Sequence, residues 1–480
     1  MDTPKHPEAS RSGVPGEAAN LVAALVARAR AAQAIADGYD QARIDDVVAA
    51  AGWAILEPKR NRALAELAVR DTGIGDVEDK VLKNHRKTLG LLRDLHGMKT
   101  VGVMSHDKAT GIVEIARPVG VVCAVTPSTN PAATPANKII NSLKARNAVI
   151  VAPSPKGVST CAMLLEFVHA ELDRVGAPRD LVQMLPAPIT KDATAELMRQ
   201  CDLVVATGSQ ANVRAAYASG TPAFGVGAGN VASIVDETAD LEDAAAKIVQ
   251  SKIFDNATSC SSENSIVLVE PIADAMLAAL ARRGCVRVQG EDRRRLEACM
   301  WPDGKLSPSV IGQSIRVIAA RAQLEDPAAH SAAILLVDES GAGPGHRFSG
   351  EKLSPVLAVY RVGDFAEAKE IVRRIYAHQG AGHSVSLHSA KEDRAVELGL
   401  TLPVARVIYN QVHVVANGGS FSNGLPVSLS MGCGTWGRNN FSDNLNVRQY
   451  MNVTRVAFPI REHVPTVEDL LGDYFQRWGK

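Results

Sequence analysis

Apolar residues in the first hundred positions recur every three to four residues, which is the spacing of one buried face of an α-helix. The spacing is clearest within Glu17 to Leu56, in "LVAALVARARAAQAIADGY" and "QARIDDVVAAAGWAIL", and helical character continues to about Leu95. Residues 1–16 are polar and carry no such period. The sequence therefore predicts a disordered or frayed N-terminus followed by a helical region.

Beyond residue 100 the pattern changes to short β-branched runs that alternate with helical stretches. "GIVEIARPVGVVCAVTPST" opens the series, and "AVIVAPS", "LVQMLP", "DLVVATGS" and "ASIVD" follow, with helices expected near 159–176, 193–199 and 211–219. A second series from Leu241 contains "ENSIVLVE", "AAILLVDE", "PVLAVYRV", "HSVSLHS" and "ARVIYN". This alternation predicts two α/β units with mostly parallel sheets, and the glycine-rich residues 225–230 mark the passage between them.

Composition excludes several classes of partner. The chain has 480 residues, of which 46% are hydrophobic, so it can bury a large core in two or three domains. Lys plus Arg equals Asp plus Glu at 52 each, and only 4% of residues are aromatic, which argues against binding of nucleic acid or of an anionic membrane. No run reaches the roughly 18 apolar residues of a membrane span, and the first twenty residues lack the apolar core of a signal peptide. We expect a cytosolic protein.

Seven cysteines are scattered without paired spacing, and the odd number excludes a fully paired set of disulfides within the chain. No CxxC or HExxH motif occurs, so we expect no metal site. Most of these thiols are expected to fill core space. Cys260 differs, because "FDNATSCSSENSIVLVE" places it in a small polar segment before a strand-like run, Ser265 to Val269. A reachable, rigidly held thiol can attack a carbonyl as thiolate; an inert buried thiol is the alternative.

Two glycine-containing segments are candidates for phosphate binding. The GxGxxG match at 432–437 lacks a clear strand before it and a helix after it, so we expect these glycines only to let a tight loop pass close to another backbone. In "VVATGSQANVRAAY" a buried strand leads through Thr207, Gly208 and Ser209 into a helix. The helix N-terminus offers unpaired N–H groups to an anion, although Ser209 could serve only as a helix cap.

The segment "FDNATSCSSENS" resembles the nucleophile segment of the CoA-acylating branch of the aldehyde dehydrogenase superfamily. Four further segments resemble that branch in consistent order, so that the likeness covers about residues 20–460: "TPSTNPAATPANKIINSLKARNAVIVAPSPKG", "VVATGSQANVRAAYASGTPAFGVGAGN", "GEKLSPVLAVY" and "GAGHSVSLHS". The resemblance implies an α/β, aldehyde dehydrogenase-like fold with a Rossmann-type cofactor domain, an α/β catalytic domain and a small bridging or oligomerisation element. A homodimer or homotetramer is also implied.

The resemblance also sets the expected domain bounds. The dinucleotide-binding domain would span 17–228, with bridging strands near 100–122, and the catalytic thiol domain would span 229–430. Residues 431–480 would return to the cofactor domain, complete the bridging element and end in a tail. We expect the strand-like Gly111 to Val122 and the segment near Asn439 to Val456 to form that bridging element.

Functional roles carry over from the resemblance residue by residue. Cys260 would be the nucleophile, and the Asn130 amide would hold the developing oxyanion together with the nucleophile's N–H. Glu351 would bind the nicotinamide ribose. Thr207, Gly208 and Ser209 would lie at the pyrophosphate. Two roles are open for His383: it assists transfer to the acceptor thiol, or it is a structural histidine near the pocket.

Two departures from the wider superfamily refine the expected activity. Gly225 stands where hydrolytic members carry a glutamate that activates water, and a glycine cannot act as a general base, so the acyl thioester should persist until coenzyme A arrives. Many members bind the adenosine ribose through Lys-Pro-x-Glu, where this chain has "APSPK", residues 152–156. Without that carboxylate, Ser154 and Lys156 could accommodate a 2′-phosphate, which favours NADP slightly over NAD.

The sequence thus predicts a CoA-acylating aldehyde dehydrogenase that uses NADP or NAD, coenzyme A and no metal. The tail "GTWGRNNFSDNLNVRQYMNVTRV" most resembles members that convert sulfoacetaldehyde to sulfoacetyl-CoA, and Arg438 is a candidate donor to the sulfonate; alternatively, it pins the tail to the body. Acetaldehyde, propionaldehyde and succinate semialdehyde remain alternative substrates. A hydrolytic enzyme and a non-catalytic assembly subunit that kept the fold are the alternative functions.

Overall fold

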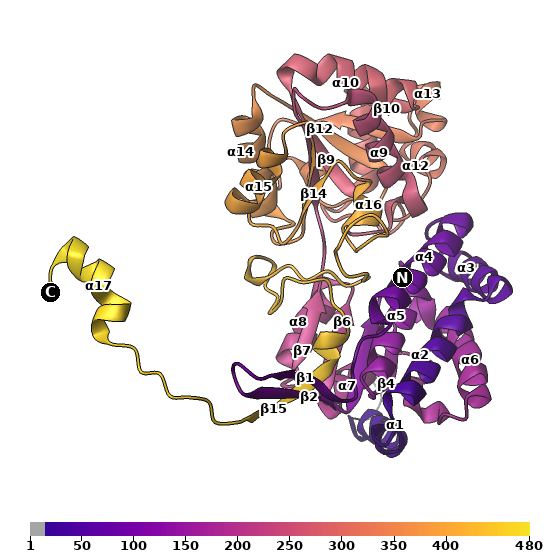
Figure 1. The fold of residues 1–480 in the computed structure, drawn as a ribbon. Helices are drawn as coiled ribbons and strands as arrows, with labels where there is room; N and C mark the ends of the chain where they lie inside the picture. Colours follow the sequence, from indigo (N-terminus) through magenta and orange to yellow (C-terminus); the bar gives the residue numbers. More distant parts are fainter. Residues whose placement is uncertain (1–14) are drawn as a thin grey trace, which may run out of the picture.

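The structure, a computed structural model, describes residues 15–480. This part of the chain begins with four helices (Figure 1). They are α1 (Pro15–Asp37), α2 (Gln41–Leu56), α3 (Pro58–Thr72) and α4 (Val77–Leu95). The side chains of Asp40 and Asp76 cap α2 and α4, and Gly73 ends α3 in the left-handed conformation. The predicted helical region is confirmed. Residues 1–14, most of the segment expected to be frayed, lie outside the described residues.

The first parallel sheet has five strands in the order β5-β4-β3-β6-β7. Its strands are β3 (Val121–Thr126), β4 (Ala148–Pro153), β5 (Val182–Met184), β6 (Leu203–Thr207) and β7 (Ala223–Val226). The connecting helices are α5 (Ala133–Lys144), α6 (Val158–Arg174), α7 (Lys191–Gln200) and α8 (Gln210–Ala218). Every residue of β3 and β4 is buried, as expected for strands covered on both faces. The chain runs outward through β4 and β5 and then returns to β6, so the topological switch point lies between β3 and β6.

The second parallel sheet has seven strands in the order β10-β11-β12-β9-β8-β13-β14 and lies above the first in Figure 1. Its strands are β8 (Val231–Val235), β9 (Glu263–Val269), β10 (Cys285–Arg287), β11 (Ile334–Asp338), β12 (Val356–Val362), β13 (Val385–His388) and β14 (Val407–Tyr409). Successive residues of β9 alternate between two hydrophobic cores, one on each face of the sheet. Both predicted parallel sheets are therefore confirmed.

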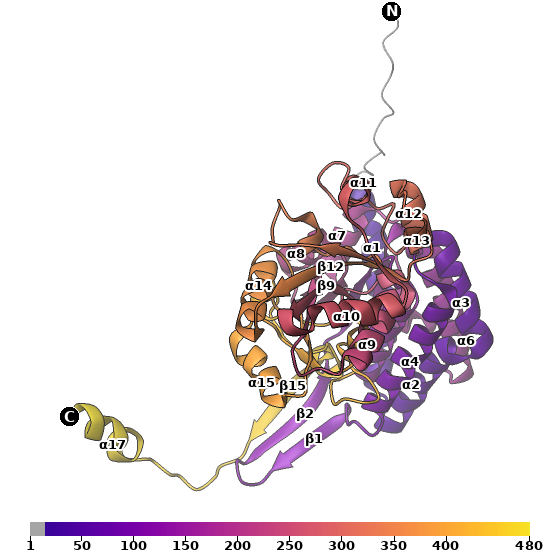
Figure 2. The same cartoon turned by 90° about the horizontal axis from the view of Figure 1, so that it is seen from above.

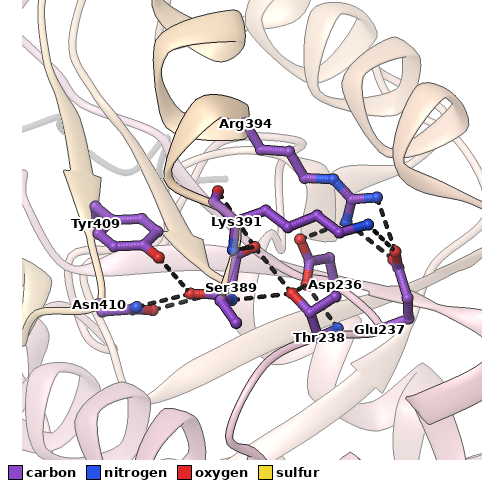
Figure 3. A network of polar contacts seen from close by, with 9 residues as sticks. Asp236, Glu237, Thr238, Ser389, Lys391, Arg394, Tyr409 and Asn410 are labelled. Atoms are coloured by element: carbon purple, nitrogen blue, oxygen red, sulfur yellow. Dashed lines mark hydrogen bonds and ion pairs between the residues drawn. The ribbon is translucent and has the colours of Figure 1, made fainter.

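Helices cover the faces of this second sheet. They are α9 (Leu241–Ile253), α10 (Glu270–Arg282), α11 (Gly290–Met300), α12 (Ile315–Ala322), α13 (Pro327–His330), α14 (Phe365–His378), α15 (Glu392–Thr401) and α16 (His413–Ala416). A polar network joins the carboxyl ends of β8, β13 and β14, where Asp236, which is fully buried, pairs with Arg394 at 2.5 Å and Asn410 donates to the Ser389 carbonyl at 2.8 Å (Figure 3). This network fixes the sheet edge that faces away from the first sheet.

A small antiparallel sheet stands out from the body in Figure 2. Its strands, in the order β1-β2-β15, are β1 (Gly102–Asp107), β2 (Ile112–Pro118) and β15 (Met451–Ala457). The strand expected from Gly111 to Val122 is in fact two strands, because Gly120, at φ 122°, turns the chain from β2 into β3. A side chain at Gly120 would collide with Asp202, since an added Cβ would lie 2.3 Å from its Oδ2.

Beyond β15 the chain continues away from both large sheets and ends in α17 (Val467–Trp478), which lies apart from the rest of the molecule in Figures 1 and 2. None of the α17 residues is buried. Within residues 15–480, no helix has both the length and the hydropathy that crossing a membrane requires.

Candidate active site

The candidate residues lie along two facing sheet edges. Cys260, Glu351 and His383 come shortly before β9, β12 and β13, so they share the amino edge of the seven-stranded sheet. The other candidates lie at the carboxyl edge of the five-stranded sheet: Asn130 follows β3, Ser154 and Lys156 follow β4, and residues 207–209 begin at the last residue of β6. β7 passes directly into β8 through residues 227–230, and the two edges meet at this passage.

Cys260 is half-buried, and its Sγ lies 3.4 Å from His383 Nε2. Burial, reinforced by the Glu351 carboxyl group, raises the pKa of the Cys260 thiol to about 12. Burial, reinforced by the Arg406 guanidinium, lowers the pKa of His383 well below its ordinary value. The ligand-free site therefore holds a neutral thiol beside a neutral imidazole. Such an imidazole can accept the thiol proton as the sulfur attacks.

The backbone before Cys260 adopts an unusual conformation. Asp255, Asn256 and Ala257 have φ angles of 51°, 50° and 58°, three consecutive non-glycine residues in the left-handed region. Each such residue costs about 1–3 kcal/mol and persists only where its surroundings hold it. The buried carboxylate of Asp255 supplies the restraint, because it forms ion pairs with Lys80 and Lys83 of α4. These lysines fix the turn that presents the nucleophile, and the sequence reasoning missed both.

Asn130 contacts the same cluster of charges. Lys83 Nζ donates to Asn130 Oδ1 at 2.8 Å. Among residues 15–480, the Asn130 NH2 group has only a long contact of 3.5 Å, to Thr129 Oγ1. Asn130 and Ser259, the residue before the nucleophile, line one cavity of about 50 Å³. The amide nitrogen is thus available to a carbonyl oxygen that enters this cavity.

The wall of that cavity was not predicted from the sequence. Its apolar part comes from Phe254, Val414, Val415 and Leu429, and its cationic part from Lys83, Arg86 and Lys87 of α4. A wider surface cleft of about 490 Å³ adjoins the cavity, and Arg86, Phe254 and Val415 line both spaces. Arg438 is exposed at the end of the 3-10 turn Thr435–Gly437 and lines neither space.

Glu351 meets the nucleophile segment through Gly229. The Gly229 N–H donates to Glu351 Oε1 at 3.1 Å, and a Cβ at Gly229 would lie 2.1 Å from the Cys260 carbonyl oxygen, so only glycine fits there. Burial raises the pKa of Glu351 to about 8, and this carboxyl group is mostly protonated at neutral pH.

The residues expected at the cofactor lie beside the switch point. Gly208 has φ 147°, and an added Cβ there would lie 3.7 Å from Pro127 at the end of β3. Ser209 accepts a hydrogen bond from Asn212 N–H at 3.3 Å and so caps α8. The alternative expected from the sequence, that Ser209 serves as a helix cap, therefore also agrees with the structure. Thr207 Oγ1 lies 2.6 Å from Ser430 Oγ. An uncovered helix N-terminus with a glycine before it fits the phosphates of a dinucleotide.

The turn after β4, where the resemblance leads us to expect the adenosine, carries an exposed cation. Lys156 is exposed, next to Ser154 in the turn after β4, and makes no ion pair with any residue of 15–480. This donor set fits a 2′-phosphate. Within the same described range, no three His, Cys, Asp or Glu side chains gather as a metal site requires.

Gly225 and the glycines of the GxGxxG match each lie close to a neighbouring part of the chain. A Cβ at Gly225 would lie 2.7 Å from Val213 Cγ1, so a side chain at this position would meet α8. In the GxGxxG match, a Cβ at Gly437 would lie 3.0 Å from the Ala381 carbonyl oxygen. The prediction that these glycines let one loop pass close to another backbone is confirmed.

Comparisons with known proteins cover nearly the whole chain. The model described as "Aldehyde dehydrogenase family" matches residues 7–295. The chain is 66% identical to the sulfoacetaldehyde dehydrogenase (acylating) of Cupriavidus necator, over 99% of this chain and 96% of that relative. It is 43% identical to the protein of the same name from Bilophila wadsworthia, over 94% and 98%. The crystal structure of an acetylating aldehyde dehydrogenase from Geobacillus thermoglucosidasius matches with a TM-score of 0.89 at 34% identity, covering 94% of this chain and 99% of that one.

Proposed function

The chain belongs to the aldehyde dehydrogenase family and has its α/β fold, and on this premise we propose that it oxidises sulfoacetaldehyde to sulfoacetyl-CoA with NAD(P)+. The resemblance found in the five sequence segments is confirmed. The observation that carries the proposal is the Cys260 thiol at 3.4 Å from a neutral His383, in a chain with glycine at the place of the hydrolytic base. The relatives named as acylating sulfoacetaldehyde dehydrogenases support the substrate.

The first half-reaction forms a thioester on the enzyme. Cys260 Sγ bonds to the aldehyde carbon, and His383 Nε2 takes the thiol proton. The Asn130 amide and the Cys260 N–H donate to the resulting oxyanion, where one donor contributes about 2.7–4 kcal/mol to the transition state. NAD(P)+, when bound, supplies the acceptor for the hydride that leaves the same carbon. Loss of the hydride leaves the acyl group on Cys260 as a thioester.

The second half-reaction transfers the acyl group to coenzyme A. Once the thioester has formed, His383 releases the first proton to solvent. The CoA thiol then attacks the thioester carbon and gives its own proton to His383, and this proton passes to Cys260 Sγ as the sulfur is displaced. Water is a poor competitor, because Gly225 has no side chain and the Glu351 carboxyl is mostly protonated at neutral pH. One thioester is exchanged for another of similar energy, and we expect the reaction to be reversible. None of these steps needs a metal ion.

Three finer assignments belong to the same proposal. NADP is favoured over NAD because Lys156 is exposed and unpaired among the described residues, where a 2′-phosphate would lie. A homodimer or homotetramer is supported by the exposed strands of the β1-β2-β15 sheet, which light scattering would test. A cytosolic location is supported by seven free thiols with no disulfide in residues 15–480.

The test uses single substitutions and a substrate panel. Cys260→Ser should abolish NAD(P)H formation, whereas Cys299→Ser, which alters a half-buried thiol on α11, should leave it unchanged. Omission of CoA should stop turnover after about one NAD(P)H per active site. Sulfoacetaldehyde should give the largest kcat/KM among sulfoacetaldehyde, acetaldehyde, propionaldehyde and succinate semialdehyde. Steady oxidation without CoA would favour a hydrolytic enzyme, and cofactor binding without any oxidation would favour an assembly subunit.

His383 needs a separate measurement. His383→Asn should slow the single-turnover formation of NAD(P)H by about 10²–10⁴-fold, the usual contribution of a positioned proton acceptor. A structural histidine would instead leave that rate within a few fold and change only thermal stability. The comparison therefore decides between the two roles that the sequence leaves open.

A further inference from the structure

Two neighbouring spaces beside the nucleophile segment, the inner cavity lined by Ser259 and the wider cleft, are lined by cations. The inner cavity contains Lys83, Arg86 and Lys87, and the wider cleft contains Arg86 and Lys247. None of the described residues that line either space is an aspartate or a glutamate. The whole chain has equal numbers of basic and acidic residues, 52 each, so this one-sided lining is a local feature. A cleft of one sign concentrates ligands of the opposite charge.

Two of the inner cations are already committed to protein groups. Lys83 binds Asp255 and Asn130. Lys87 donates to the backbone carbonyls of Gly418 and Gly419 at 2.9 and 3.0 Å, and burial lowers its pKa to about 7. Neither ammonium group is therefore free to become the main partner of a bound anion.

Arg86 is different. It is exposed, and it makes no hydrogen bond or ion pair with any residue in 15–480; its guanidinium lies 5.3 Å from the centroid of the Phe421 ring. It lines both the cavity and the cleft, so it stands where the two join. The aromatic ring can hold the guanidinium plane while all five N–H donors stay available to a ligand.

From this arrangement we propose that Arg86 is the residue that selects the anionic end of the aldehyde. The inference rests on the proposed function and adds the substrate subsite to it. A sulfonate is ionised at every working pH, and a guanidinium fork matches two of its oxygens. The cavity of about 50 Å³ beside Asn130 takes only a short aldehyde end, which leaves a sulfonate one methylene away at the mouth beside Arg86. Lys87 adds attraction at longer range, whereas the charge of Lys247 is offset by its ion pair with Asp243.

The neutral aldehydes provide the comparison. Acetaldehyde and propionaldehyde carry no group that could bind a cation, so the Arg86 guanidinium contributes nothing to their transition states. Succinate semialdehyde carries a carboxylate on a longer chain and should benefit in part. Arg86 therefore determines specificity, and the bond-making steps at Cys260 do not depend on it.

The test compares Arg86→Gln with Arg93→Gln in the full-length enzyme. Arg93 is the matched control, because it lies on the same helix and over the same Phe421 ring at 5.2 Å, but it is paired with Asp94 and lines neither the cavity nor the cleft. Arg86→Gln should lower kcat/KM for sulfoacetaldehyde by about 10- to 100-fold, mostly through KM. The same variant should change kcat/KM for acetaldehyde by less than about twofold. Arg93→Gln should change neither.

Other results of these measurements would contradict either the role of Arg86 or the proposed substrate. An equal loss for both aldehydes in Arg86→Gln would overturn the inference, as would a selective loss in Arg438→Gln without one in Arg86→Gln. In either case a wild-type enzyme that turns over sulfoacetaldehyde would still support the proposed function. If the wild type prefers succinate semialdehyde and Arg86→Gln loses that activity selectively, the proposed substrate fails and the anion subsite stands.

Discussion

Lys83 Nζ donates to Asn130 Oδ1 at 2.8 Å and also pairs with the buried carboxylate of Asp255. One ammonium group thus connects the amide expected at the oxyanion to the left-handed turn before Cys260. The contact also orients the amide: because its oxygen accepts from Lys83, its NH2 group is the end left for a substrate oxygen. Lys83 is therefore a positioning residue for both halves of the oxyanion site.

Lys83→Met should lower kcat by about 10- to 100-fold, since loss of an oxyanion donor costs about 10²–10³ and a misoriented donor is partly lost. Lys80→Met is the matched control, because Lys80 also pairs with Asp255 but does not contact the Asn130 amide. Both variants break a buried ion pair and should lower thermal stability. Steady-state kcat and KM together with melting temperature separate the effects. Equal kcat losses in the two variants would refute the positioning role.

The sequence allowed prediction of those site residues whose signal is local. Cys260, Glu351 and His383 each lie in a short segment before a strand, and such a segment has a recognisable pattern. Lys83 and Arg86 have no such signal, because on an amphipathic helix they look like part of a solvated face. The proposed role of Lys83 depends on a partner, Asp255, that follows it by 172 residues, and that of Arg86 depends on the cavity and cleft that it lines. Arg438 was singled out instead because its segment resembles the family's tail.

The segment from Gly111 to Val122 shows that the fold, too, could be predicted from the sequence only in part. The residues from Gly111 to Val122 are rich in isoleucine and valine, and this composition alone suggests one strand. The structure divides them at Gly120, where the chain leaves the antiparallel sheet and enters the buried β3. At this break the Asp202 carboxylate fills the space beside Gly120 and accepts a hydrogen bond from the Val121 N–H at 2.8 Å. That contact spans too many residues for a periodicity to reveal.

The pKa of Cys260 predicts its reactivity in the ligand-free enzyme. Because burial raises this pKa to about 12, the thiolate fraction, and with it the rate of alkylation by iodoacetamide, should rise about tenfold per pH unit from pH 7 to at least pH 10. Peptide mass spectrometry after timed quenching would measure modification at Cys260. Free glutathione under the same conditions is the control, and its rate should level off near pH 9. A plateau for Cys260 near neutral pH would show that a thiolate already exists beside His383.

The exposed position of Lys156 leads to a prediction about the preference for NADP over NAD. Lys156→Glu should lower kcat/KM for NADP by at least about tenfold and leave that for NAD unchanged or higher, because a carboxylate repels the 2′-phosphate and can accept from the ribose hydroxyls. Lys305→Glu makes the same charge change at an exposed position elsewhere and should alter neither value. Initial rates with both cofactors provide the measurement. A wild type that prefers NAD, with no effect of Lys156→Glu, would contradict the assignment.

The burial of His388 leads to a prediction about how the free energy of unfolding depends on pH. It is buried in β13, and neither ring nitrogen has a hydrogen-bond partner among the described residues. Burial, reinforced by Lys247 and opposed by Asp243, lowers its pKa from 6.5 to about 4. A base with a depressed folded-state pKa binds its proton more readily when unfolded, so the free energy of unfolding should fall as pH drops from 6.5 towards 4. At 1.36 kcal/mol per unit, the contribution of His388 reaches about 3 kcal/mol at pH 4.

His388→Leu removes this proton site and also an unpaired buried polar group, so the variant should be at least as stable as the wild type at pH 7.5. Its advantage should then grow as pH falls through 6.5, because only the wild type must keep this ring neutral. Urea unfolding midpoints between pH 4.5 and 7.5 would measure the difference. Activity at pH 7.5 should be unaffected, since His388 lies at the carboxyl end of β13, whereas His383 precedes its amino end. Parallel stability curves for the two proteins would mean that His388 keeps an ordinary pKa in the fold.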